Sequence, residues 1–127
     1  MRYMAPTFLD STLRRGKSLE QFLGGVVLNG ENSIRWLELR PVEESIQVWE
    51  FVAPDLGDQE NLDFYEFLGS EEGTLAATLS SSSEALAYAH EHLSATSLRW
   101  LNQGVAQDEY RDFIVAGRPT SWPAAGA

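Results

Sequence analysis

The sequence predicts an α+β domain with an antiparallel sheet of about four to five hairpin-connected strands in its N-terminal two-thirds, covered on one face by C-terminal helices. Two observations support this fold class. Short β-branched and aromatic runs separated by turn residues fill most of the region 26–79, whereas the region 81–117 carries helix formers with capping spacings. Strands joined by short turns pair antiparallel. The 127 residues suit a single domain, residues 1–127.

Both ends of the chain lack regular patterns. Residues 1–17 show no clear hydrophobic period and are predicted to form an irregular N-terminal arm, and residues 119–127 are predicted to form a mobile tail. After the arm, Ser18 and Gln21 have the spacing of a capping box. This spacing predicts one or two helical turns, which the glycine pair starting at Gly24 would end.

Five segments have the composition of strands. They are residues 26–28, 34–39, 46–52, 62–68 and 74–79. Asn29-Gly30 is a favoured dipeptide of a tight turn and predicts that the first two segments form a hairpin. The pair Glu43-Glu44 marks the next turn, and an acidic loop precedes the aromatic segment 62–68.

Two helices are predicted after the strands. Ser81 and Glu84 have capping-box spacing, and residues 85–93 are rich in helix formers. A second helix is expected to begin at Asp108, to bury aromatic side chains and to end at Gly117.

The composition excludes several classes of protein. The chain has no cysteine, so it has neither disulfides nor thiolate metal sites, and a cytoplasmic location is expected. Its N-terminus lacks the continuous apolar stretch of a signal peptide, and no apolar run is long enough to span a bilayer. We therefore expect neither secretion by that route nor membrane insertion.

The net charge of −10 is concentrated in the middle of the chain. The segment from Glu31 to Glu72 holds twelve carboxylates against Arg35 and Arg40, which gives this segment alone a charge of −10. A field of this sign repels nucleic-acid phosphates and anionic lipids and attracts basic partners. We therefore expect a basic protein as partner, and no direct binding to nucleic acid or membrane.

The two histidines do not predict a metal site. His90 and His92 lie two residues apart in a predicted helix, so their side chains point about 200° away from each other and cannot bind one ion. We expect His90 to face the core and His92 to lie near solvent, where a cation interacts favourably with the helix dipole.

No other motif predicts catalysis or a cofactor. The serine run 80–83 is explained by helix capping, and the glycines match neither a phosphate loop nor a dinucleotide fingerprint. Oxygen ligands for calcium occur in the acidic loop, but their spacing is not that of an EF-hand. The sequence therefore predicts no catalytic residue, metal or cofactor.

Three glutamates fall inside predicted strands, namely Glu38, Glu50 and Glu66. We expect them to line one face of the sheet as exposed positions of a half-solvated antiparallel sheet.

Large apolar side chains occupy both faces of the strand 46–52, because Trp49 and Phe51 alternate with valines. One face is expected beneath the helices. The other either meets the N-terminal arm or is an exposed aromatic patch that binds a protein.

These observations favour a small acidic, non-enzymatic protein-binding domain, of the type that inhibits a basic partner such as a nuclease toxin. Immunity proteins follow this logic, since their carboxylates take the place of phosphates. The expected partner-binding residues are Trp36, Glu38, Trp49, Glu50, Asp55, Asp58, Glu60, Asp63 and Tyr65. Two alternatives stay open: a small enzyme or ligand-binding domain that uses Tyr65, Glu66 and His90 in a pocket between sheet and helices, and a self-associating scaffold protein.

Overall fold

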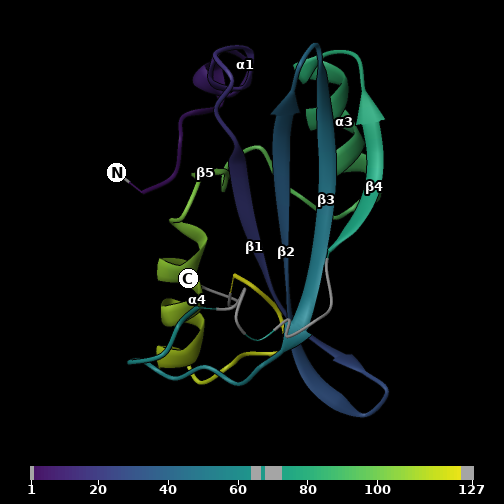
Figure 1. Cartoon of the computed structure of the whole chain (residues 1–127). Coiled ribbons are helices and arrows are strands. Elements are labelled where there is room, and N and C mark those ends of the chain that lie inside the picture. Colours follow the sequence, from purple (N-terminus) through teal and green to yellow (C-terminus); the bar gives the residue numbers. More distant parts are fainter. Residues whose placement is uncertain (1, 64–66, 68–72, 124–127) are drawn as a thin grey trace.

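The computed structural model describes residues 2–63, 67 and 73–123 (Figure 1). A five-stranded antiparallel sheet with the order β4-β3-β2-β1-β5 forms its centre, which confirms the predicted α+β class. The elements in chain order are η1 (Pro6–Phe8), α1 (Leu9–Arg14), β1 (Leu19–Leu28), β2 (Glu31–Val42), β3 (Ser45–Pro54), β4 (Thr74–Leu79), α3 (Ser82–His92), β5 (Leu101–Asn102) and α4 (Ala106–Val115).

The two hairpins at the centre of the sheet follow from local turn chemistry. Asn29 and Gly30 adopt φ angles of 52° and 78°, as a tight hairpin turn requires, and the flanking Leu28 and Glu31 pair across β1 and β2. Glu43, with a φ of 57°, begins the corresponding turn between β2 and β3. Both hairpins were predicted from the sequence and are confirmed.

The prediction of helical turns after Ser18 is wrong. Residues 19–28 form β1 instead, because Leu19 pairs with Leu39 and Phe22 pairs with Trp36 of β2, so that apolar side chains are buried on both faces. Pairing with a neighbouring strand outweighs the local capping signal. A bulge between Phe22 and Gly24 then shifts the register.

The N-terminal arm is also more regular than predicted. Residues 9–14 form helix α1, whose Leu9 and Leu13 are buried in the core. These two apolar residues lie four apart, so they share one face of the helix.

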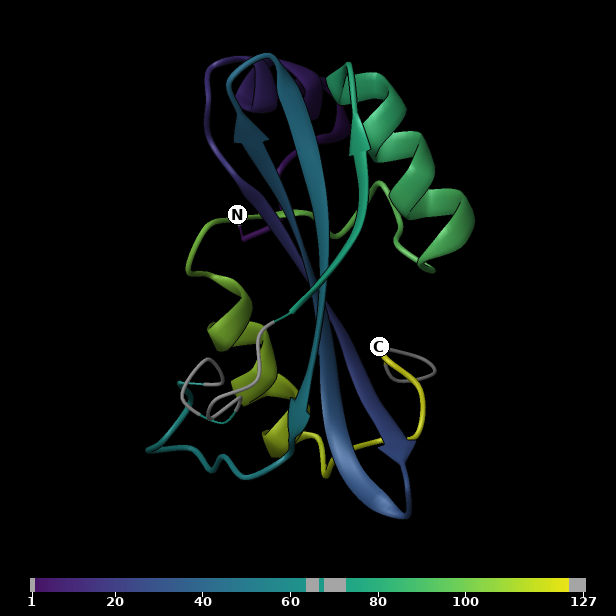
Figure 2. The same cartoon turned by 45° about the vertical axis from the view of Figure 1, so that its right-hand side comes forward.

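The sheet is covered on both faces, whereas we expected helices on one. Figure 2 shows α3 and α4 on opposite sides of the strands. The physical reason is that β2 and β3 bury apolar side chains on both faces. The paired Leu39 and Val48 pack with α1 and α3, and the paired Trp36 and Phe51 pack with α4. The two cores therefore lie back to back across the sheet.

The two C-terminal helices occur where the sequence predicted helices. The Ser81 hydroxyl caps α3 by accepting a hydrogen bond from the Glu84 amide. Helix α4 begins at Ala106, two residues before the predicted start, and buries Tyr110 and Phe113. Its preceding strand β5, only two residues long, was not predicted.

The strand β4 confirms the prediction for residues 74–79. The aromatic strand predicted over residues 62–68 falls mostly outside the described residues. In the described ranges, no helix is long and apolar enough to cross a membrane.

Candidate partner-binding surface

The acidic loop after β3 is fixed to helix α4 through its first residue, Asp55. Tyr110 donates a 2.5 Å hydrogen bond to Asp55 Oδ1, and Arg118 Nε donates one of 2.8 Å to Asp55 Oδ2. The Gly57 amide in turn donates to the Tyr110 hydroxyl at 2.9 Å, and the Gly57 carbonyl accepts from Arg118 at 2.6 Å. The Asp55 side chain is only 5% exposed. Asp55 therefore positions the loop instead of offering a free charge, which corrects the prediction for this residue.

The environment of Tyr110 keeps its phenol protonated. Burial raises the pKa of Tyr110 well above its ordinary value, and the hydrogen bond to the Asp55 carboxylate raises it further. A protonated hydroxyl can donate to Asp55 while it accepts from the Gly57 amide. The network is thus stable at neutral pH.

The next part of the loop is a compact turn. Asp58 Oδ1 accepts hydrogen bonds of 2.9 Å from the amides of Glu60 and Asn61, and the backbones of Asp58 and Asn61 pair with each other. Asp58, Glu60 and Asp63 are all exposed. Within the described ranges none of these three carboxylates has a cationic partner. They form what we call the acidic loop surface.

The aromatic and acidic residues predicted on the sheet do not join this surface. Trp36 is fully buried and stacks on Phe51 with ring centroids 5.2 Å apart. Trp49 is half-buried, donates from Nε1 to Gln47, and lies under the Arg40 guanidinium at 4.9 Å. Helix α4 covers the face on which Trp36 lies, so no exposed tryptophan patch forms there. Tyr65 lies outside the described residues.

Glu38 and Glu50 lie on opposite faces of the sheet, not on one face as expected. Glu38 pairs with Trp49 in the register and Glu50 pairs with Leu37, so the two glutamates alternate. Glu38 is only 3% exposed and is held by Arg40 Nε at 2.9 Å. Glu50 is half-buried and accepts a 2.5 Å hydrogen bond from Arg35. Neither is free for a partner, and Glu66 lies outside the described residues.

Two further buried carboxylates were missed by the sequence reading. Glu20 Oε1 accepts hydrogen bonds from the amides of Gly104 and Ala106 at 2.9 and 3.4 Å, so it caps the start of α4. No local spacing signals this contact, because Glu20 is more than eighty residues away from the helix that it caps.

Glu109, which is fully buried, binds both Arg99 and the indole of Trp122. Arg99 also lies over the ring of Tyr3 at 4.6 Å. Burial raises the pKa of Tyr3, and the nearby Glu109 carboxylate raises it further. Segments near both ends of the chain thus converge on α4.

The histidines occupy the places that the helix pattern predicted. His90 is half-buried and accepts a 3.0 Å hydrogen bond from Trp100 Nε1, while the side chain of His92 is 60% exposed. Burial lowers the pKa of His90, which keeps it a neutral acceptor. The described residues contain no group of three or more potential ligands placed to hold a metal ion.

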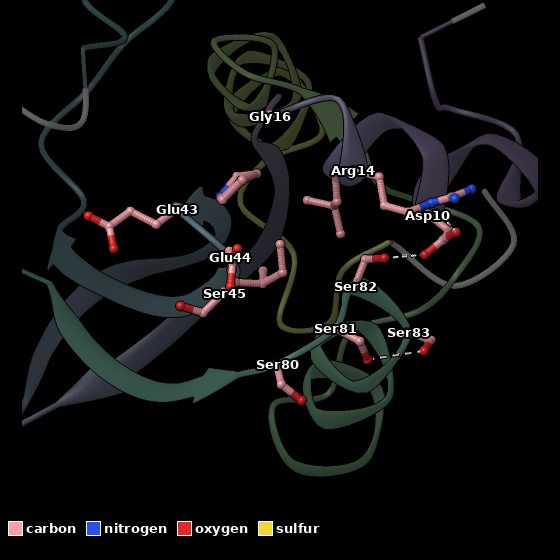
Figure 3. A pocket seen from close by; sticks show the side chains of 13 residues that line it. Asp10, Arg14, Gly16, Glu43, Glu44, Ser45, Ser80, Ser81, Ser82 and Ser83 are labelled. Carbon is pink, nitrogen blue, oxygen red and sulfur yellow. Dashed lines mark hydrogen bonds and ion pairs between the residues drawn. The ribbon is translucent and has the colours of Figure 1, made fainter.

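A second acidic feature lies at the other end of the sheet. Figure 3 shows a pocket of about 460 Å³ between α1, the β2–β3 turn and the start of α3. Glu43 and Glu44 on its rim are exposed. Asp10 accepts a hydrogen bond from Ser82 and pairs with Arg14 at 2.8 Å, so its charge is compensated. The pocket presents acidic and hydroxyl groups, and no histidine is among the described residues that line it.

Comparison of the chain with protein-family models, with curated proteins and with solved structures gives no match.

Proposed function

We propose that the protein is a small non-enzymatic binding domain that captures a basic protein through the acidic loop surface. The observation that carries this proposal is that the carboxylates fall into two groups, one buried and bonded and the other exposed. Glu20, Glu38, Asp55 and Glu109 are buried and bonded within the domain. Asp58, Glu60 and Asp63 are exposed and, among the described residues, have no cationic partner. Three of the exposed carboxylates thus lie close together on one anchored loop.

The acidic loop can both attract a basic partner and hold it, because the loop is anchored to the rest of the domain. Uncompensated carboxylates steer a basic partner during diffusion and accelerate association, most strongly at low ionic strength. The hydrogen-bonded turn at Asp58 and the attachment of Asp55 to Tyr110 reduce the conformational freedom that binding would otherwise remove. A nuclease toxin is a suitable class of target, since its phosphate-binding groove is basic. The domain would then act as an inhibitor or immunity-type protein.

Neutralising the loop without disturbing its turn tests the proposal. The variant Asp58→Asn/Glu60→Gln/Asp63→Asn keeps a side-chain oxygen at position 58 for the amides of residues 60 and 61. We expect this variant to capture the native partner from a host lysate about tenfold less than the wild-type protein, through slower association.

The control variant Glu43→Gln/Glu44→Gln/Glu91→Gln removes the same number of exposed charges elsewhere on the surface. Equal loss of capture in both variants would show that only the net charge matters. Capture that is unchanged by the loop variant and by added salt would overturn the proposal.

A further inference from the structure

The outer edge of strand β1 is open along most of its length. Strand β5 pairs only with Leu19 and Glu20, and among the described elements no strand pairs with the outer side of residues 21–28. These eight residues contain neither a charge nor a proline. Because proteins usually protect free edges with such residues or cover them, this edge needs a cover.

The C-terminal segment Arg118–Pro123, which we call the strap, supplies that cover. Trp122 lies against Gly24, where an added Cβ would come within 2.5 Å of the Trp122 Cβ. Pro119 and Thr120 line a groove of about 340 Å³ together with Val26 and Val27 of β1 and with Asn32 and Ser33 of β2. Figures 1 and 2 show this yellow segment leaving α4 and crossing to the strands near the β1–β2 hairpin. Later strap residues face earlier β1 residues, so the strap runs antiparallel to β1.

The strap is held by two side chains. Arg118 binds Asp55 and the Gly57 carbonyl at one end. At the other end, Trp122 donates from Nε1 to Glu109 at 2.8 Å and packs edge-on against Phe113, with ring centroids 5.6 Å apart.

The residues between these two anchors are weakly attached. Thr120 and Ser121 are exposed. Among the described residues, 119–123 make no backbone hydrogen bond to β1. The strap therefore covers the edge without forming a strand, and competition can displace it.

The groups beneath the strap define what could replace it. Without the strap, the nearly buried Asp55 would lose its cation, and the fully buried Glu109 would lose its indole donor. Asp55 would keep the Tyr110 hydroxyl and Glu109 would keep Arg99. The loss of one partner of a buried carboxylate still costs free energy, so both sites favour a substitute. The substitute must supply a cation at one end and an aromatic N–H donor at the other. The groove between them is lined by Phe113 and Gly25.

We propose that the strap is a built-in occupant of a docking site for an extended basic segment of a partner protein, in which an arginine is followed four residues later by a tryptophan. This inference rests on the proposed function, since it specifies which part of a basic partner the domain holds. The partner segment adds to the open edge of β1 as an extra strand, and the strap competes with it.

The test uses a fluorescent peptide with the strap sequence Arg118–Pro123 and the full-length variant Arg118→Ala/Trp122→Ala. In fluorescence anisotropy, we expect the peptide to bind this variant at least tenfold more tightly than it binds the wild-type protein, whose site is occupied. Peptides carrying Arg118→Glu or Trp122→Ala should lose this binding. Adding Asp55→Asn to the protein variant should weaken it about tenfold, because the cation loses its partner.

Hydrogen exchange then locates the bound peptide, which should slow amide exchange in residues 21–28 of the folded variant. If the double variant fails to fold, Trp122→Ala alone, with Arg118 retained, replaces it in the same titration. No binding to a folded variant at millimolar peptide, or equal binding to the wild-type protein, would overturn the inference. The readout is binding of the strap peptide and not capture of the native partner, and Asp58, Glu60 and Asp63 keep their carboxylates in every protein of this test. A failure here would therefore leave the proposed function standing.

Discussion

The Tyr110 hydroxyl donates a 2.5 Å hydrogen bond to Asp55 Oδ1, which joins helix α4 to the first residue after strand β3. The same oxygen accepts from the Gly57 amide at 2.9 Å. The Tyr110 hydroxyl thus pairs with both the Asp55 carboxylate and the Gly57 amide. These two hydrogen bonds fix the position at which the acidic loop begins. The position of the acidic loop surface therefore depends on Tyr110, a residue that is itself uncharged.

Removing this hydroxyl should destabilise the domain measurably. Tyr110→Phe leaves the nearly buried Asp55 carboxylate and the Gly57 amide each without one partner, so we expect a loss of about 1–3 kcal/mol in urea unfolding. Because the pKa of Tyr110 is raised by folding, its contribution is complete below about pH 10 and is lost as the pH rises above that value. The wild-type protein should therefore lose stability above pH 10 more steeply than the variant.

Tyr88→Phe is the matched control for that experiment. The Tyr88 hydroxyl donates only a 3.3 Å hydrogen bond to the Ala76 carbonyl of the edge strand β4. Its removal should cost less than 1 kcal/mol, roughly the lower end for a hydrogen bond. An equal loss in both variants would mean that the Tyr110 network contributes nothing beyond an ordinary surface contact.

Features determined by local chemistry could be predicted from the sequence. Asn29-Gly30 formed the expected turn, and Ser81 capped α3 through the Glu84 amide. In both cases, the residues that determine the conformation lie within three positions of each other.

Features that depend on partners far along the chain were predicted less well. The segment after Ser18 has a helical capping signal, and only its pairing with β2 makes it a strand. The alternation of apolar residues in β3 showed that both faces of the strand are apolar. It did not show that α3 covers one face of the sheet and α4 covers the other.

The sequence predicted that the candidate surface is acidic, but it did not predict which of the acidic residues are exposed. Asp58, Glu60 and Asp63 are exposed as expected, because turn residues surround them. Asp55 belongs to the same acidic run, yet it is buried by contacts with residues 55 and 63 positions away. Trp36 is likewise buried by the unexpected coverage of the second face, and Glu38 is buried and paired with Arg40. Composition reports the charge, whereas tertiary contacts decide which charges remain free.

His90 should make folding sensitive to mild acid. Its pKa is lowered by burial, so the unfolded chain takes up a proton more readily than the folded protein does. Its contribution to stability is complete above about pH 6.5 and is lost as the pH falls through that value toward the lower folded pKa. Protonation also removes the lone pair that accepts from Trp100 Nε1. We expect the free energy of unfolding to decline as the pH falls below about 6.5.

The variant His90→Gln retains an acceptor but cannot titrate, so this decline should become shallower in urea titrations at stepped pH. His92→Gln, at the exposed histidine of the same helix end, is the control and should leave the decline in place. If His92→Gln flattened the profile and His90→Gln did not, the assignment to His90 would be wrong.

Gly24 should be the least replaceable residue of the open edge of β1. Its φ of 94° disfavours any side chain, and an added Cβ would lie 2.5 Å from the Trp122 Cβ. Gly30, with a φ of 78° in the hairpin turn, has no atom within 4 Å of an added Cβ. Gly30→Ala therefore measures only the free-energy cost of placing a side chain at a positive φ. We expect about 1–2 kcal/mol of destabilisation for Gly30→Ala and at least about 1 kcal/mol more for Gly24→Ala, since overpacking adds to strain. The difference should shrink in the Trp122→Gly background, because glycine lacks the Cβ that an alanine at position 24 would meet. Equal losses in the two alanine variants would contradict a close contact between Trp122 and β1.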